Sequence, residues 1–183
     1  TDSILLEWEA EWNKNVKSIN DAKVNKVILD LRSNPGGFFD AAIYAADDML
    51  DEGFTISQQR DAKGNVKKYD STKGGSLLGA KILLLVDEGS ASASEIVAGA
   101  LQQSKRATIM GKMTYGKGTA QRIFDFSDGS SLHLTIVKWL LPDGKNIDKS
   151  NPIVPDISVH YTNADFEKGI DPQLNKAIEE LNK

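Results

Sequence analysis

The chain has 183 residues, of which 40% are hydrophobic, and a formal net charge of −4. This length suffices for one well-buried domain and is short for two. Acidic and basic residues are interspersed without the basic stripe of a nucleic-acid binder, so we expect no nucleic-acid partner. The absence of cysteine excludes disulfides, a thiolate nucleophile and zinc-finger spacing.

The sequence also contains no targeting signal. No apolar run reaches the ~18 residues of a membrane-spanning helix, and no charged-then-apolar leader stands at the N-terminus. If the natural protein is exported or anchored, we expect the segment responsible to lie outside these residues.

The first half of the chain alternates between helical and strand patterns. Apolar residues at three- and four-residue steps predict an amphipathic helix over 4–19. Residues 24–31 are apolar and β-branched enough for a strand buried on both faces, followed by a glycine-rich loop at 33–37. Helical spacing resumes over 38–50, and weak alternation over 54–70 predicts an exposed polar hairpin.

The second half continues the alternation. Residues 81–86 predict a buried strand, 92–103 a core helix and 107–110 a short strand, which together are typical of an α/β fold. An Asp-Gly turn between 121–126 and 131–141 predicts a second hairpin. The chain ends in a predicted helix over 171–181, with Asp171 as N-cap and Pro172 in its first turn.

The segment Gly89-Ser90-Ala91-Ser92-Ala93-Ser94-Glu95 lies where a buried strand turns into a helix. Such a junction exposes side chains and free backbone N–H groups together, so a serine there can act as a nucleophile beside a suitable base. The alternative is capping, because serine is a preferred N-cap and Glu95 could complete a capping box with Ser92. A cap and a nucleophile can coexist, so both interpretations stay open.

Lys117 is flanked by Gly116 and Gly118, which is unusual for a surface charge. Glycines are used where a chain bends sharply or approaches another group closely, so we expect the lysine amine to be enclosed. Burial would favour the neutral amine that can accept a serine proton, and Ser-Lys pairs are a known variant of the catalytic triad.

Three blocks, taken in order, resemble the tail-specific or carboxyl-terminal processing proteases, a serine peptidase family with a Ser-Lys pair. The resemblance extends from about Val24 to the C-terminus and includes a late Pro155-Asp156. The blocks are Asp30-Leu31-Arg32-Ser33-Asn34-Pro35-Gly36-Gly37, Gly89 to Glu95, and Gly116-Lys117-Gly118-Thr119-Ala120-Gln121. This likeness implies an α/β fold with the spiral core of Clp-type proteases and crotonases, to which the hairpins are additions.

Residue by residue, the resemblance implies that Ser92 is the nucleophile, that Lys117 is the general base, and that Gln121 holds the lysine amine in line. It also implies an oxyanion hole made by the N–H of Ala93 and that of either Gly36 or Gly37. The implied function is a serine endopeptidase that cleaves protein or peptide substrates near their C-termini. No metal or cofactor is implied.

Members of this family usually carry a PDZ module before the core, which captures the substrate's C-terminal residues by strand addition. Nothing of that module is evident, so we expect residues 1–183 to be the catalytic core of a longer protein. The resemblance further implies an exported bacterial protein, periplasmic or membrane-anchored, and leaves oligomerisation open. Gln103 departs from the family, which often has aspartate at that position.

Two rival functions on the same fold are a non-catalytic binding module and a pseudoprotease scaffold with a complete but locked site. The presence of Ser92, Lys117 and Gln121 argues against the first. Other notable residues are expected to serve structure, as partners at a strand end or in packing; these are Asp30, Arg32, His133, His160, Trp8, Trp12 and Trp139.

Overall fold

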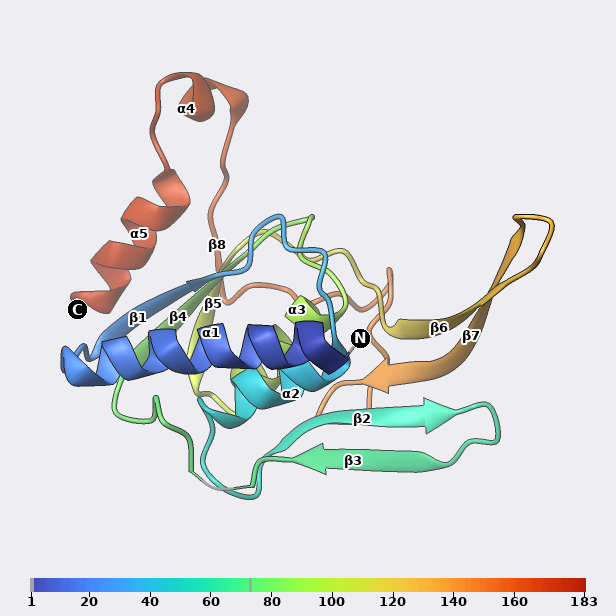
Figure 1. The fold of residues 1–183 in the computed structure, drawn as a ribbon. Helices are drawn as coiled ribbons and strands as arrows, with labels where there is room; N and C mark the ends of the chain where they lie inside the picture. Colours follow the sequence, from blue (N-terminus) through green and yellow to red (C-terminus); the bar gives the residue numbers. More distant parts are fainter. Residues whose placement is uncertain (1, 73) are drawn as a thin grey trace.

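The computed structural model describes residues 2–72 and 74–183. Its helices are α1 (Asp2–Asp21), α2 (Phe39–Asp47), α3 (Ala93–Gln103), α4 (Asn163–Glu167) and α5 (Pro172–Leu181) (Figure 1). Its strands are β1 (Lys26–Asp30), β2 (Thr55–Asp61), β3 (Val66–Asp70), β4 (Lys81–Val86), β5 (Ala107–Gly111), β6 (Thr119–Asp125), β7 (Ser131–Leu140) and β8 (Ile157–Ser158). The predicted α/β class with additional hairpins is confirmed.

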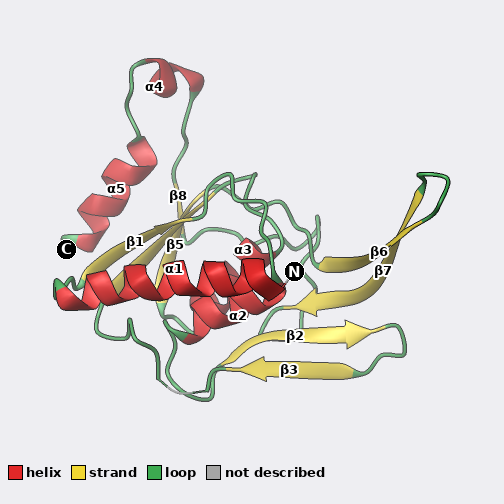
Figure 2. Cartoon of the chain, viewed as in Figure 1, coloured by secondary structure: helices red, strands yellow, loops and turns green. Residues whose placement is uncertain are grey.

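A parallel sheet in the order β1-β4-β5-β8 forms the body of the molecule. Successive residues of β4 point to opposite faces, so its uninterrupted apolar run enters two hydrophobic clusters. Leu84 packs in the cluster shared with α2 and α3, whereas Leu83 and Leu85 pack against Ala177 of α5. Helices therefore cover both faces of this sheet (Figure 2).

The second sheet is antiparallel and has the order β3-β2-β7-β6. β6 and the part of β7 that pairs with it extend away from the body as a two-stranded ribbon (Figure 1). We call residues 119–140 the β6–β7 ribbon. Among the strands of residues 2–72 and 74–183, β6 pairs with β7 alone, so it is an edge strand of the sheet.

Two segments form the predicted elements, but the burial expected for each of them was wrong. The strand predicted over 24–31 forms as β1, but its residues are exposed or only partly buried because β1 lies at the edge of the parallel sheet. The hairpin predicted over 54–70 forms as β2 and β3, yet it is not wholly exposed: Ile56, Ser57 and Gln58 are buried, since β2 packs against α3. Short α4 and β8 were not predicted.

The predicted final helix is confirmed in its details. Asp171 is the N-cap of α5 and its side chain accepts a hydrogen bond from the Leu174 N–H, with Pro172 in the first turn. Within 2–72 and 74–183, no helix combines the length and apolarity needed to cross a membrane.

Candidate active site

Ser92 stands at the turn between β4 and α3. It is the N-cap of α3 and adopts φ 55° and ψ −115°, a conformation that non-glycine residues rarely take. Its N–H donates to the Glu95 carboxylate at 2.9 Å, so Glu95 supplies its half of the predicted capping box. Backbone strain of this kind concentrates at functional sites, because the surrounding structure must hold it in place.

The glycine-rich loop after β1 packs directly on the serine turn. The carbonyl oxygen of Asn34 accepts hydrogen bonds from the Ala91 N–H at 3.0 Å and the Ser94 hydroxyl at 3.1 Å. Gly36 has φ +91°, and a Cβ there would lie 2.6 Å from the Ala91 oxygen and 2.7 Å from the Ala93 nitrogen. Only glycine therefore allows the two segments to approach this closely.

The backbone N–H groups beside Ser92 differ in their partners. The Gly36 N–H donates to Asn34 Oδ1 at 2.9 Å. The N–H groups of Gly37 and Ala93 donate to no acceptor within 2–72 and 74–183. Of the two glycines proposed for an oxyanion hole, Gly37 is thus the one with a donor available beside that of Ala93.

Lys117 lies between β5 and β6, at the root of the ribbon. A Cβ on Gly118 would collide with the Ile147 carbonyl oxygen, so close approach explains this glycine, as the sequence suggested. Contrary to expectation, however, Lys117 is not enclosed: the residue is exposed. In the described chain its amine forms no hydrogen bond or ion pair, and none joins it to Ser92, although both residues line the same cavity.

Glu95 connects the serine turn to the lysine loop. Its fully buried carboxylate accepts from the Thr114 hydroxyl at 2.6 Å, the Gly116 N–H at 2.7 Å, the Lys117 N–H at 2.8 Å and the Ser92 N–H. Donors from both loops thus satisfy one buried charge. Sequence reasoning assigned Glu95 to capping alone and missed this second role, because nothing in the sequence indicates that the loop at 114–117 folds onto its carboxylate.

A cavity of about 560 Å³ lies between the body and the ribbon. Of the predicted site residues, Ser92, Ala93, Gly37, Lys117 and Gln121 line it. Its other lining residues are mainly apolar or aromatic, and they are Phe38, Phe39, Ile96, Thr119, Ala120, Ile123, His133 and Trp139. The tertiary structure therefore brings five of the six predicted residues to one cavity.

Gly36, the sixth, lines a neighbouring cavity of about 470 Å³ together with Trp8 and Trp12. These tryptophans stack on one another at 5.6 Å between ring centroids, and Trp139 stacks on Phe39 at 4.3 Å, so the expected packing roles hold. Gly37 and Ala93 line both cavities and thus stand between them.

Asp30 and Arg32 are structural partners, as expected. Arg32 forms ion pairs with Asp30 at 2.7 Å and Asp171 at 2.8 Å, which ties the end of β1 to the start of α5. Partial burial of Asp171 acts to raise the pKa of its carboxyl, but hydrogen bonds from Arg32 and the Leu174 N–H outweigh it and hold the pKa below its usual range.

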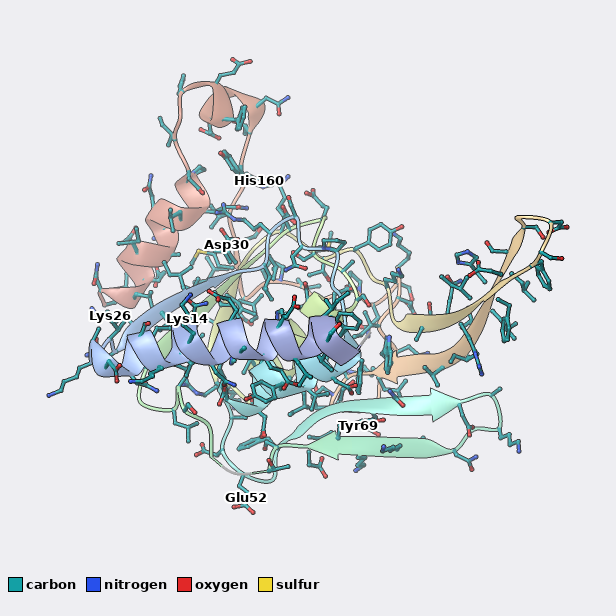
Figure 3. The ribbon with its side chains drawn as sticks, viewed as in Figure 1. Lys14, Lys26, Asp30, Glu52, Tyr69 and His160 are labelled. Carbon is teal, nitrogen blue, oxygen red and sulfur yellow. The ribbon has the colours of Figure 1, made fainter. Side chains whose placement is uncertain are left out.

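Three further residues lie away from the cavity that contains Ser92 or at its rim. Gln103 accepts a hydrogen bond from the Asp143 N–H at 2.9 Å and so holds the turn after β7. His160 lies on the segment that leads to α4 (Figure 3), whereas His133 is exposed on β7, where it contacts Ser131 and lines the cavity rim. Nowhere in 2–72 and 74–183 do three His, Cys, Asp or Glu side chains gather as metal ligands would.

Comparison with known proteins places this geometry in a family. The sequence profile of peptidase family S41 matches residues 3–159. The chain belongs to peptidase family S41. Its S41 relatives include a protein of Staphylococcus epidermidis named "Probable CtpA-like serine protease", 43% identical over 74% of this chain and 28% of that protein, and a carboxy-terminal-processing protease of Bartonella bacilliformis, 39% identical over 85% and 36%.

Solved structures agree with the S41 assignment. The photosystem II D1 C-terminal processing protease superposes with a TM-score of 0.75 and 33% identity, over 84% of this chain and 39% of that one. Mature CPAF superposes with a TM-score of 0.73 over 97% and 45%; at 16% identity it shows a shared fold alone. The chain spans about a third of the length of the curated relatives it matches.

Proposed function

We propose that this chain is the catalytic part of a serine endopeptidase that cleaves polypeptides near their C-termini with a Ser92-Lys117 dyad. The observation that carries the proposal is the shared cavity. A strained serine, a lysine, a glutamine and two N–H groups that have no acceptor among the described residues line one space. Each step of acyl transfer has a matching group there. Membership of a serine peptidase family and relatives named as carboxy-terminal-processing proteases support the substrate class.

In the proposed reaction, neutral Lys117 accepts the proton of the Ser92 hydroxyl as its oxygen attacks the scissile carbonyl carbon. The lysine then returns this proton to the leaving amine as the peptide C–N bond breaks. Water hydrolyses the resulting ester by the same route. Gln121 acts as a positioning residue, because its side-chain amide can accept a hydrogen bond from the lysine amine and hold it toward Ser92.

The negative charge that develops on the carbonyl oxygen needs donors fixed in advance. We assign this role to the N–H groups of Ala93 and Gly37. Gly36 has a different role, since its own N–H is used by Asn34 and its missing side chain lets the loop approach the serine turn. The neighbouring hydrogen bonds to the Asn34 and Leu31 carbonyls hold both donors in place.

Covalent labelling tests the proposal directly. We expect a fluorophosphonate probe to label the chain at Ser92, as located by mass spectrometry of the digested protein. Ser90→Ala and Ser94→Ala should retain labelling, whereas Ser92→Ala should abolish it. Labelling of another serine, or none together with no hydrolysis of an unfolded protein, would refute the assignment.

The rival function is a pseudoprotease scaffold with a complete but locked site, and the exposed Lys117 without a bond to Ser92 is the observation that favours it. The same experiment separates the two. A locked site would stay unlabelled by the probe even at high concentration, while a working dyad would react at a rate that falls on Lys117→Ala.

A further inference from the structure

We propose that the free edge of β6 binds the substrate as an added strand and delivers its backbone to Ser92. This inference rests on the proposed function and names how the substrate is held. The partner it requires is an extended, unfolded polypeptide segment with apolar side chains, recognised mainly through its main chain.

The direction of the backbone groups of β6 follows from its pairing with β7. The Phe126 N–H donates to the Ser130 carbonyl just beyond the paired strands. In an antiparallel pair the residues alternate between those bonded to the partner strand and those turned away from it. Phe124 therefore bonds toward β7, whereas Gln121 and Ile123 turn their N–H and C=O groups to the open edge.

These edge positions are continuous with the catalytic cavity. β6 begins at Thr119, two residues after Lys117, and the side chains of Gln121 and Ile123 line the cavity that contains Ser92. Gln121 and Ile123 thus offer main-chain hydrogen bonds at the open edge of β6, and they also line the cavity that contains Ser92. A strand added here would enter the cavity rather than pass beside it.

The surface chemistry of the ribbon fits an apolar extended chain. Ile123 is 55% and Phe124 38% exposed, and they point to opposite faces because they are neighbours on a strand. On the neighbouring strand β7, Leu132 and Leu134 are also exposed. In Figure 3 many side chains of the outer part of the ribbon stand out from it, away from the body. An exposed edge of this kind is a template for pairing with another strand.

Amide hydrogen exchange on the Ser92→Ala chain tests the arrangement independently of catalysis. The probe is an unstructured peptide of about 12 residues with apolar residues at alternate positions, long enough to match a strand. We expect it to slow exchange of the Gln121 and Ile123 amides by ~10-fold or more, because they gain acceptors, and to leave the Phe124 amide unchanged. Protection of both classes alike, or of neither under saturating peptide, would overturn the proposal.

A matched pair of variants tests the same edge in the active chain. Ile123→Ala removes the side chain but keeps the N–H, whereas Ile123→Pro also removes an N–H that β7 does not use, and proline is tolerated at such edge positions. We expect Ile123→Pro to lower kcat/KM on reduced, carboxymethylated α-lactalbumin by about tenfold relative to Ile123→Ala. Equal values in two folded variants would overturn strand addition while leaving the proposed function intact.

Self-association through the edge is a separate outcome. If a second copy of this chain occupied β6, the Gln121 and Ile123 amides would be protected without peptide, to an extent that rises with protein concentration. That result would overturn the substrate proposal. Failure of the wild-type chain to hydrolyse any unfolded protein, with alternating protection still present, would instead refute the proposed function alone.

Discussion

The two halves of the candidate site are built differently. The serine half belongs to the body, where hydrogen bonds join the Ser92 turn to the Asn34 loop. The lysine half stands at the root of the exposed ribbon, with Lys117 and Gln121 both open to solvent. The serine half is therefore preorganised, whereas the lysine half is anchored through its backbone, by bonds to Glu95 and to the Ser90 carbonyl, and not through the Lys117 side chain.

This contrast indicates where control of the activity can lie. The proposed oxyanion hole lies in this rigid half and would need no reorganisation during the reaction, which favours transition-state stabilisation. An open lysine, in contrast, can be brought into line when substrate or another part of the protein covers it. Substitutions in the two halves should therefore differ in the size and in the kind of their effects.

The largest effect is expected at the proposed Ser92-Lys117 dyad. Lys117→Arg keeps a cation but its guanidinium stays protonated and cannot accept the serine proton, so kcat/KM on an unfolded protein should fall by ~10⁴-fold or more. Ser92→Ala should lower kcat/KM by as much, and the double variant should lower it no further, because the two groups act as one unit. Lys112→Arg, which alters a lysine paired with Glu88, is the control and should keep full activity.

Glu95→Gln tests the connection between the halves. Its amide cannot accept from all four donors, so buried N–H groups lose their partner at a cost of about 1–3 kcal/mol each. We expect a lower free energy of unfolding in urea and a fall of ~10²-fold in kcat/KM from misplacement of Lys117. Glu88→Gln, at an exposed carboxylate, is the matched control; equal effects of the two would mean that Glu95 does not position the lysine.

Gly36→Ala tests how closely the loop must approach the serine turn. A Cβ at this φ would press on Ala91 and Ala93, so we expect a loss of about 1–3 kcal/mol of stability together with reduced activity. Gly37→Ala places its Cβ in open space and should change stability by less than ~0.5 kcal/mol. Thermal unfolding of both variants gives the comparison, and similar losses at the two positions would contradict it.

The pH dependence of stability should reveal the ion pair between Arg32 and Asp171, which ties the end of β1 to the start of α5. Because the folded-state pKa of Asp171 is lowered, its contribution is present above the unfolded value near ~4 and is lost as the pH falls through the folded value. We expect Asp171→Asn to lose about 1 kcal/mol at neutral pH and to approach the wild type in acid. Urea unfolding at several pH values measures this; a constant difference down to acid would argue against the ion pair with Arg32.

The smallest effect is expected on the ribbon. Leu134→Ala removes a half-exposed side chain and should change the free energy of unfolding by less than ~0.5 kcal/mol. Leu84→Ala, in the fully buried centre of β4, should cost about 2–5 kcal/mol because it leaves a cavity in the core. A large loss at Leu134 would show that the ribbon is packed more tightly than its exposure indicates.

Elements that depend on neighbours along the chain could be predicted from the sequence alone. The apolar run of β4, the hairpin turns and the Asp171 cap follow from periodicity and from local hydrogen bonding, which need no distant partner. The order of the three motifs indicated the S41 family and, with it, the candidate residues Ser92, Lys117 and Gln121. The predicted elements and the family were confirmed because short-range patterns and the order of the motifs along the chain carry them, whereas the roles of these three residues stay a prediction.

Features that depend on distant contacts became visible only in the folded chain. The edge position of β1, the exposure of Lys117 and the use of the Gly36 N–H by Asn34 cannot be read from patterns, since each depends on which segments lie alongside. Glu95 is the clearest case. Its sequence position indicates a cap, but folding brings the Thr114 loop to the same carboxylate, and a buried charge must collect its partners from wherever the fold supplies them.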